Sequence, residues 1–311
     1  MRMRKIEEKK SSVTLSAAAQ DFLAIKRAQL LSAETLRDYE MQLGRFIRSS
    51  ANSTDYETLE RDTLNFFSSI PNTSSARYNK PYQYITAFLS WMVKEGHISR
   101  NPITANELRK RRDDGNIKPV SVEELRCFMD KLDRKTYTGL RTYTVILVML
   151  DCGIRTKELL QLREDDFNAV AGTLLVSKTI AKTRRERILY LSPQTVKAIV
   201  AFIQIKPAEW EKWLFPNYEG KQLTTTYLDK DFAKNSKVSG IKITPYQLRH
   251  SFATLYLKGG GDLFTLQKQM GHSDLRMTKR YTEIDNGFLQ EQHATFSPVH
   301  LLGQKPKIIK I

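Results

Sequence analysis

One charged segment divides the chain and limits what it can fold into. Residues 107–119 read ELRKRRDDGNIKP, with Gly115 and Pro119 near the end and little apolar content. Such a segment cannot contribute much to a hydrophobic core, so we interpret it as an exposed linker. With 311 residues, the chain is long enough for a buried core on each side. The sequence therefore predicts two domains rather than one continuous core.

The residues before this segment are expected to be helical throughout. SAETLRDYEMQLGRFI, residues 32–47, has apolar side chains at helical spacing behind Ser32, a good N-cap residue. Residues 76–96 repeat the apolar face and end at Gly96, and Asn101 precedes a proline that ends the domain. A four-helix unit with a basic linker would suit a clamp around a rod-shaped polyanion. A helical bundle with a solvated charged loop explains this part equally well.

The residues after the linker predict a second, mostly helical domain with one small antiparallel sheet. Residues 121–124 form a capping-box pattern, and TYTVILVML (142–150) is apolar all round, which predicts a buried central helix. TLLVS (173–177) and ERILYL (186–191) flank a basic connection, which predicts a β-hairpin. Further helix starts are expected at Ser192, Thr244, Asp262 and Ser273.

The sequence thus predicts a mainly α protein in five parts. These are a basic N-terminal segment (1–11), a helical domain (12–105), a linker (106–118), a second domain (119–290) and a C-terminal tail (291–311).

The charge balance indicates a polyanionic partner. The chain has 50 Lys and Arg against 34 Asp and Glu, a net charge of +16, which favours nucleic acid first and an anionic membrane second. The membrane is the weaker choice, because no apolar run approaches the roughly 18 residues of a transmembrane helix. The N-terminus MRMRKIEEKK also lacks the apolar region of a secretory signal.

The remaining composition excludes some site classes. Cys127 and Cys152 lie in apolar stretches, which predicts packed, reduced thiols and a cytoplasmic protein. We find neither a His/Cys cluster with zinc-ligand spacing nor a Gly-rich phosphate loop, so we expect no metal site and no ATP use.

Four candidate site residues stand near helix starts. Arg155 follows an apolar helix and a Gly turn, and Glu158 can lie on the same helical face and orient its guanidinium. Tyr246 and Arg249 occupy the first turns of the helix starting at Thr244, where free N–H groups favour a phosphate. Two of the four also have an ordinary explanation. Arg155 could be a structural or surface arginine, and Tyr246 a half-buried packing residue.

Three further candidates lie on the hairpin and near the C-terminus. Lys182 is placed on the hairpin tip, where a solvated charge is the ordinary explanation. His272 follows Gly271, a predicted helix stop, and alone would be a cap or a core histidine. Tyr281 comes nine residues after His272, among basic residues, and alone would be a surface residue of an amphipathic helix.

In order, these residues give Arg-x-x-Glu after a Gly turn, Lys on a hairpin, Tyr-x-x-Arg at a helix start, Gly-His, and a tyrosine nine residues later. The arrangement resembles the tyrosine site-specific recombinases, the phage-integrase-like and Xer-like group. The resemblance covers about residues 12–290 and is carried by SSARYNKPYQYITAFLSWMVKEGHISRNP, CGIRTKELLQL, TPYQLRHSFAT and MGHSDLRMTKRYT. It implies a helical, SAM-like core-binding domain and a mostly helical catalytic domain with a small antiparallel β-sheet, forming a C-shaped DNA clamp.

The resemblance implies a role for each candidate. Arg155 and Arg249 would clamp the scissile phosphate and stabilise its pentacoordinate transition state. Tyr281 would attack the phosphorus, giving a 3′-phosphotyrosyl link and a free 5′-hydroxyl. Lys182 would be the general acid for the leaving 5′-oxygen, because AKTRRER aligns with the family's hairpin pattern, with Lys178 as the alternative.

One position departs from the family pattern. The family usually has His where this chain has Tyr246, and an ordinary tyrosine, with a pKa of about 10, is a poor base at neutral pH. We therefore predict a positioning role for Tyr246 and greater weight on His272 as the base, beside its hydrogen bond to the phosphate. Glu158 would hold the Arg155 region in place. The basic residues supply the charge that a metal nuclease takes from Mg²⁺, and the phosphotyrosine conserves bond energy, so no cofactor is expected.

The resemblance also implies the partners. The expected substrate is double-stranded DNA with inverted-repeat core sites, bound by a homotetramer that exchanges strands through a Holliday junction. Integration, excision, resolution and movement of a mobile genetic element all fit. The tail at 291–311 would pack on a neighbouring subunit or fold back in cis. Candidate DNA contacts, chosen by charge and position, are Arg77, Lys80, Arg184 and Arg185.

Two other functions fit part of the pattern. A type IB topoisomerase-like enzyme would share the nucleophile chemistry but act alone and relax supercoils. A DNA-binding regulator with a decayed active site would keep the basic surface but not the chemistry.

Overall fold

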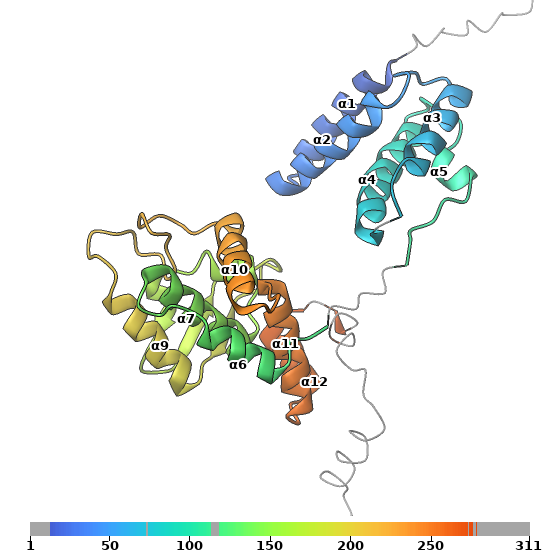
Figure 1. The fold of residues 1–311 in the computed structure, drawn as a ribbon. Helices are drawn as coiled ribbons and strands as arrows, with labels where there is room; N and C mark the ends of the chain where they lie inside the picture. Colours follow the sequence, from blue (N-terminus) through green and yellow to red (C-terminus); the bar gives the residue numbers. More distant parts are fainter. Residues whose placement is uncertain (1–12, 73, 113–117, 273, 276–277, 279–311) are drawn as a thin grey trace, which may run out of the picture. The chain divides into compact units, whose positions relative to one another are not determined.

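The computed structural model describes residues 13–72, 74–112, 118–272, 274–275 and 278 (Figure 1). The chain forms two compact units, divided between Gly115 and Asn116, and each has its own hydrophobic core. Within the described residues, no helix is both long and apolar enough to cross a membrane.

The N-terminal unit is all helical. Its core joins apolar side chains from four long helices, and Phe22, Phe46 and Phe88 are among those fully buried. Ser32 caps the second helix as predicted, because its hydroxyl accepts a hydrogen bond from the backbone N–H of Thr35. The helices are α1 (Leu15–Ala28), α2 (Ala33–Arg48), α3 (Tyr56–Ser68), α4 (Ser75–Lys94) and the short α5 (Pro102–Ala105).

The first part of the expected linker is attached to this unit. Leu108 packs against its core, and the phenol of Tyr82 donates a hydrogen bond of 3.0 Å to the Leu108 carbonyl. The amide of Asn79 exchanges hydrogen bonds of 2.8 and 2.9 Å with the backbone of Arg111. The Arg111 guanidinium also lies 4.1 Å above the ring centre of Tyr78. Leu108 and Arg111 are therefore held on the first unit, while Arg109 and Lys110 between them remain exposed.

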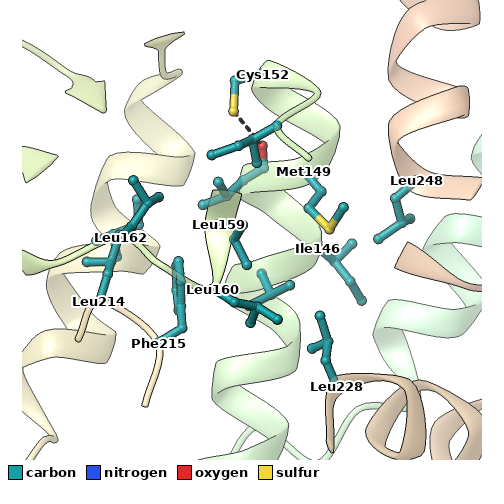
Figure 2. Close-up of a cluster of buried hydrophobic side chains, with 14 of the residues drawn as sticks. Ile146, Met149, Cys152, Leu159, Leu160, Leu162, Leu214, Phe215, Leu228 and Leu248 are labelled. Atoms are coloured by element: carbon teal, nitrogen blue, oxygen red, sulfur yellow. Dashed lines mark hydrogen bonds between the residues drawn. The ribbon is translucent and has the colours of Figure 1, made fainter. Parts of the chain in front are cut away.

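The second unit is built around helix α7. Most of α7 is buried, including Val145, Ile146, Val148 and Met149, and it packs against α9, α10 and α11 (Figure 2). Its helices are α6 (Val122–Asp130), α7 (Tyr137–Cys152), α8 (Thr156–Leu159), η1 (Glu164–Asp166), α9 (Pro193–Gln204), α10 (Thr225–Ser239), α11 (Pro245–Lys258) and α12 (Leu263–Met270).

The sheet of this unit is antiparallel, with strand order β1-β2-β3. Strands β2 (Thr173–Val176) and β3 (Arg187–Tyr190) form the predicted hairpin, with Leu174 opposite Leu189 and both side chains buried. The two-residue β1 (Phe167–Asn168) and helix α10 were not predicted. The expected fold class, mainly α with a small antiparallel sheet, is confirmed.

Local signals correctly placed several helix ends. Ser121 forms a complete capping box with Glu124, and N-cap hydrogen bonds begin the helices that follow Ser192, Thr244 and Asp262. The predicted cap Ser273 lies outside the described residues.

Gly153 ends α7 in a left-handed conformation, with φ of 62°. A Cβ atom there would also lie 2.1 Å from the ring of Phe252, so the turn requires glycine on two counts. This turn delivers Arg155 to the start of α8.

The two cysteines differ from each other. Cys152 is buried, its thiol donates to the carbonyl of Val148, and burial raises its pKa to about 12. Cys127 is exposed, because α6 turns Leu125 and Phe128 toward the core and leaves the position between them outside. The prediction of a packed thiol is wrong for Cys127.

Candidate active site

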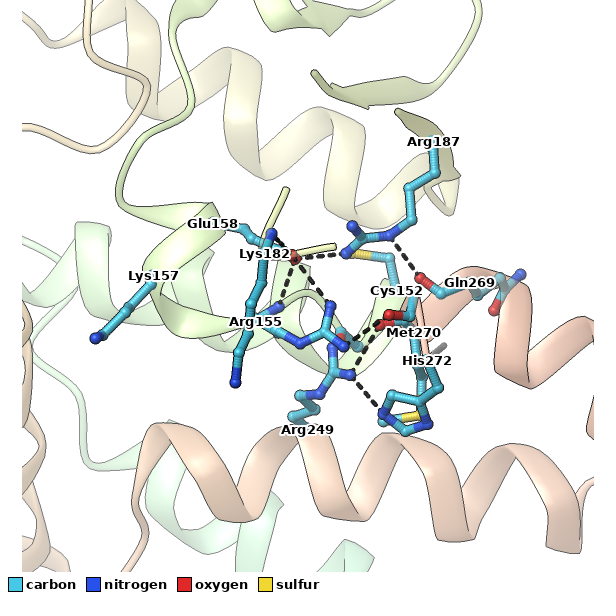
Figure 3. Close-up of polar contacts among 12 residues, drawn as sticks. Cys152, Arg155, Lys157, Glu158, Lys182, Arg187, Arg249, Gln269, Met270 and His272 are labelled. Carbon is cyan, nitrogen blue, oxygen red and sulfur yellow. Dashed lines mark hydrogen bonds and ion pairs between the residues drawn. The ribbon is translucent and has the colours of Figure 1, made fainter. Parts of the chain in front are cut away.

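Four predicted site residues come together in the second unit from separate elements (Figure 3). Arg155 precedes α8, Lys182 lies in the β2–β3 connection, Arg249 is one turn inside α11, and His272 follows α12. Contacts through Glu158 and through the end of α12 connect them.

The C-terminal end of α12 anchors three arginines. Its last carbonyl groups lack helical partners, and the negative end of the helix dipole favours cations there. Consecutive carbonyls of Gln269, Met270 and Gly271 accept hydrogen bonds of 2.9, 2.9 and 2.8 Å. The respective donors are Arg187, Arg249 and Arg155. One helix end therefore fixes where three guanidinium groups lie.

Glu158 connects the predicted clamp to the hairpin. Its buried carboxylate accepts from Arg155 at 3.1 Å, from Arg187 at 2.5 Å and from the backbone N–H of Lys182 at 3.3 Å. Burial alone would raise the pKa of this carboxyl. The hydrogen bond and charge of Arg187, with the charge of Arg155, instead lower the pKa below its usual value. Glu158 is therefore ionised at neutral pH and holds both guanidiniums.

Arg249 is buried and has backbone acceptors on both sides. It donates to the carbonyl of Gly153, in the turn before Arg155, and to that of Met270. The same Nη2 atom also lies 2.9 Å from Nε2 of His272. Both arginines of the predicted clamp are thus tied to the same turn and the same helix end.

The contacts of His272 determine its tautomer. An arginine can only donate, so Nε2 accepts from Arg249 and the ring proton is on Nδ1. This Nδ1–H donates to the hydroxyl of Thr278, 2.9 Å away. Burial and the charges of Arg249, Arg155 and Arg187 lower the pKa of His272 to about 4. In this arrangement His272 is a neutral and weak base.

Part of the β2–β3 connection packs against the core, between the two exposed lysines Lys178 and Lys182. Ile180 and Ala181 pack against the core, and turns at residues 177–181 and 181–184 follow each other. Lys182 emerges beside Glu158, through the hydrogen bond of its backbone N–H. Lys178 is exposed on the earlier turn, before the packed residues Ile180 and Ala181.

Other predicted residues lie elsewhere or outside the described chain. The side chain of Tyr246 is 56% exposed in the first turn of α11, so it faces away from the core. Tyr281 lies outside the described residues. The candidate DNA contacts Arg77, Arg184 and Arg185 are exposed, whereas the ammonium of Lys80 is 2.7 Å from the carboxylate of Asp38.

Sequence reasoning missed two residues of this site. Arg187 begins β3 and was treated only as part of an apolar strand, although it ends the AKTRRER stretch that was aligned with the family's hairpin pattern. Thr278, fully buried and bonded to His272, carried no sequence signal. The described residues contain no cluster of His, Cys, Asp or Glu that could hold a metal ion.

Comparison with known proteins identifies the family. A family model described as the phage integrase family matches residues 118–287, more than half of the chain. The tyrosine recombinase XerD of Listeria innocua serovar 6a is 28% identical over 291 residues, covering 89% of this chain and 96% of that protein. The tyrosine recombinase XerC of Caldanaerobacter subterraneus subsp. tengcongensis is 31% identical over 228 residues, covering 71% of this chain and 62% of that protein.

Solved structures share the fold. The Tn1549 transposon integrase, in complex with transposon right end DNA, has a TM-score of 0.76 at 17% identity. The match covers 92% of this chain and 100% of that one. The XerH site-specific recombinase, bound to palindromic difH substrate, has a TM-score of 0.67 at 24% identity, covering 90% and 84%. The family match, together with these recombinase relatives, shows that the chain belongs to the phage integrase family of tyrosine recombinases.

Proposed function

We propose that this protein is a site-specific DNA recombinase that cuts and rejoins DNA through a 3′-phosphotyrosyl intermediate. One observation carries the proposal: Arg155, Arg249 and His272 meet at the end of α12, and Lys182 is joined to Arg155 through the carboxylate of Glu158. A phosphodiester is the ligand that such a cluster of fixed positive charge would bind. The recombinase relatives support DNA as the substrate, and nothing in the site favours the topoisomerase or regulator alternatives.

In the proposed reaction, Arg155 and Arg249 hold the non-bridging oxygens of the scissile phosphate. The oxygen of Tyr281 forms a bond to phosphorus, and the bond from phosphorus to the 5′-oxygen breaks. The arginines stabilise the charge that develops on the equatorial oxygens, where fixed donors lower the barrier most. Religation is the reverse step, with a 5′-hydroxyl from the partner strand as the nucleophile.

Lys182 donates the proton to the leaving 5′-oxygen. Its position supports this choice over Lys178, because its backbone is bonded to the same carboxylate that holds Arg155. An ammonium group held beside the phosphate clamp can reach the leaving oxygen and remove the cost of expelling an alkoxide.

His272 takes the proton of Tyr281 only once DNA is bound. In the DNA-free protein its Nε2 accepts from Arg249, and its pKa of about 4 makes it a weak base. A phosphate that takes over the Arg249 donor would release Nε2 and offset the positive charges that depress the pKa. Imidazole titration by NMR, with and without DNA in the Tyr281→Phe variant, tests this step. An unchanged pKa on DNA binding would rule it out.

We further propose a homotetramer that binds two duplexes with inverted-repeat core sites and exchanges strands through a Holliday junction. The solved XerH complex contains a palindromic substrate, which supports the inverted repeat.

Covalent trapping tests the proposed function. Nicked duplexes from DNA that flanks the gene, chosen for inverted repeats around a short spacer, are incubated with the protein in EDTA. We expect a protein–DNA adduct that is absent in Tyr281→Phe. No adduct on any such duplex would support the decayed regulator. Relaxation of supercoils without junctions between two marked duplexes would support the topoisomerase-like alternative.

A further inference from the structure

We propose that Arg187 is a positioning residue for this reaction: it balances the charge of Glu158, so that the positive charge of Arg155 remains available to the scissile phosphate. This inference rests on the proposed function and adds to the site an arginine with no role in the chemistry proposed so far. Three observations support it.

The first observation is the charge balance around Glu158. The carboxylate is 1% exposed, and it contacts Arg155 at 3.1 Å and Arg187 at 2.5 Å. With Arg155 alone, the carboxylate would cancel the charge that the phosphate needs and would repel the phosphate itself. With Arg187 present, the three groups carry a net positive charge. The carboxylate can then orient Arg155 without neutralising the site.

The second observation is the geometry of the Arg187 side chain. It is 10% exposed, and its Nε donates to the carbonyl of Gln269 at 2.9 Å while its Nη2 reaches Glu158. A planar guanidinium can make both bonds in fixed directions, which an ammonium cannot. Arg187 therefore ties β3 to the end of α12 and to the carboxylate at the same time.

The third observation is the crowding at Gly271. A Cβ atom on this residue would lie 3.1 Å from Nη1 of Arg187 and 3.2 Å from Nη1 of Arg155. The two guanidiniums thus lie next to the same position, the one that a Cβ atom of residue 271 would take. A shift of Arg187 would open the space in which Arg155 is held.

Four proteins are compared with wild type: Arg187→Gln, Glu158→Gln, the double variant, and Arg187→Lys. The readout is the single-turnover rate of adduct formation with a nicked duplex at saturating protein, which separates chemistry from DNA affinity. For Arg187→Gln we expect a loss of about ten- to a hundredfold, the usual range for a group that orients a reacting one. Glu158→Gln in the same chain should recover about tenfold of that loss, because it removes the unbalanced carboxylate.

A merely structural role for Arg187 predicts the opposite. Glu158 also holds Arg155 and Lys182, so removing it would then slow the Arg187→Gln protein further. A double variant no faster than Arg187→Gln, or an Arg187→Gln rate equal to wild type, overturns the inference. If Arg187→Gln does not fold, Arg187→Lys decides. It keeps the charge, so we expect a rate within about tenfold of wild type, and a rate at the Tyr281→Phe background overturns the inference.

Arg141 offers a matched control in the same unit. Its guanidinium is 2% exposed, pairs with Asp231 at 2.5 Å and donates to the carbonyl of Pro216. Arg141→Gln removes the same kind of buried contact away from the site. We expect a lower melting temperature with an unchanged cleavage rate. If wild type itself forms no adduct, the proposed function fails. If wild type reacts and the Arg187 variants match it, the inference alone fails.

Discussion

The imidazole of His272 is held between Arg249 and Thr278 by hydrogen bonds of 2.9 Å each, and the bond from Arg249 opposes its protonation. Protonation would place a hydrogen on Nε2, opposite an arginine N–H that has no lone pair to accept it. The ring is also near other cations, which disfavour a further charge. The folded protein therefore keeps this histidine neutral at a pH where the unfolded chain protonates it.

This protonation difference makes stability depend on pH. The pKa of His272 is about 4 in the folded protein against 6.5 for an ordinary histidine. The unfolded chain binds the extra proton, so His272 lowers the free energy of unfolding as pH falls from 6.5 toward 4. We expect urea unfolding to show a larger loss from pH 7 to pH 5 in wild type than in His272→Gln. The difference should stay below about 1.4 kcal/mol per pH unit, because the ring is partly exposed. Equal losses would contradict the assignment.

Tyr246 is predicted to position rather than to accept a proton. Its exposed hydroxyl can donate one hydrogen bond to a phosphate oxygen or to the nucleophile. We expect Tyr246→Phe to slow adduct formation by roughly tenfold, the effect of losing one such bond to a charged group. Tyr281→Phe, measured beside it, should form no adduct. If both variants are equally inactive, a positioning role for Tyr246 is ruled out.

At the scale of an element, the end of α12 sets the arrangement of the site. Its C-cap Gly271 has φ of 61°, and a Cβ atom there would lie 3.1–3.2 Å from two guanidinium groups. Any side chain at this position faces both a strained backbone and a lack of space. The effect of crowding the arginines at Gly271 can be separated from the effect of a strained backbone by comparison with a helix-ending glycine that has open space around it.

Gly271→Ala and Gly240→Ala provide that separation. Gly240 ends α10 with φ of 74°, and a Cβ atom there would meet nothing within 4 Å. Both substitutions should cost about 1–2 kcal/mol of stability from the left-handed backbone. We expect cleavage to fall by more than about tenfold in Gly271→Ala alone, because its Cβ would displace Arg155 and Arg187. Similar cleavage by the two variants would show that the arginines tolerate the shift.

The sequence was most informative where a few neighbouring residues determine the structure. Ser121, Ser192 and Asp262 cap helices through contacts within three residues, so their local patterns were sufficient. Helix α10 buries only Leu228 and Phe232, and the two-residue β1 is too short to show a pattern.

The hydrogen bonds and ion pairs that connect the site residues could not be predicted in the same way. The order of motifs identified the candidate residues through a family resemblance. The contacts of Arg187 with Glu158 and Gln269 join segments that are 29 and 82 residues apart. The tautomer of His272 likewise depends on Arg249, whose place follows from packing between α11 and α7. Such long-range contacts leave no periodic or local signal in the chain.

At the scale of the whole molecule, the excess of basic residues should control DNA affinity. The net charge is +16, and each neutralised phosphate releases a counterion. We expect Arg184→Ala and Arg185→Ala each to reduce the slope of log affinity against log salt by about 0.9 if that residue contacts a phosphate. Lys80→Ala should change the slope less, because Asp38 already pairs with this lysine at 2.7 Å. A larger effect of Lys80 would mean that the ion pair opens on DNA.

The three carbonyls at the end of α12 hold all three arginines of the site at one point of the backbone. Gly271 is also ten residues before Tyr281, so the segment with the proposed nucleophile starts where the arginines are anchored. A small displacement of this helix end would carry the anchored guanidiniums and the start of that segment in the same direction. The distances among the three guanidiniums should then vary less than the position of any one of them, because all three are bound to the same helix end.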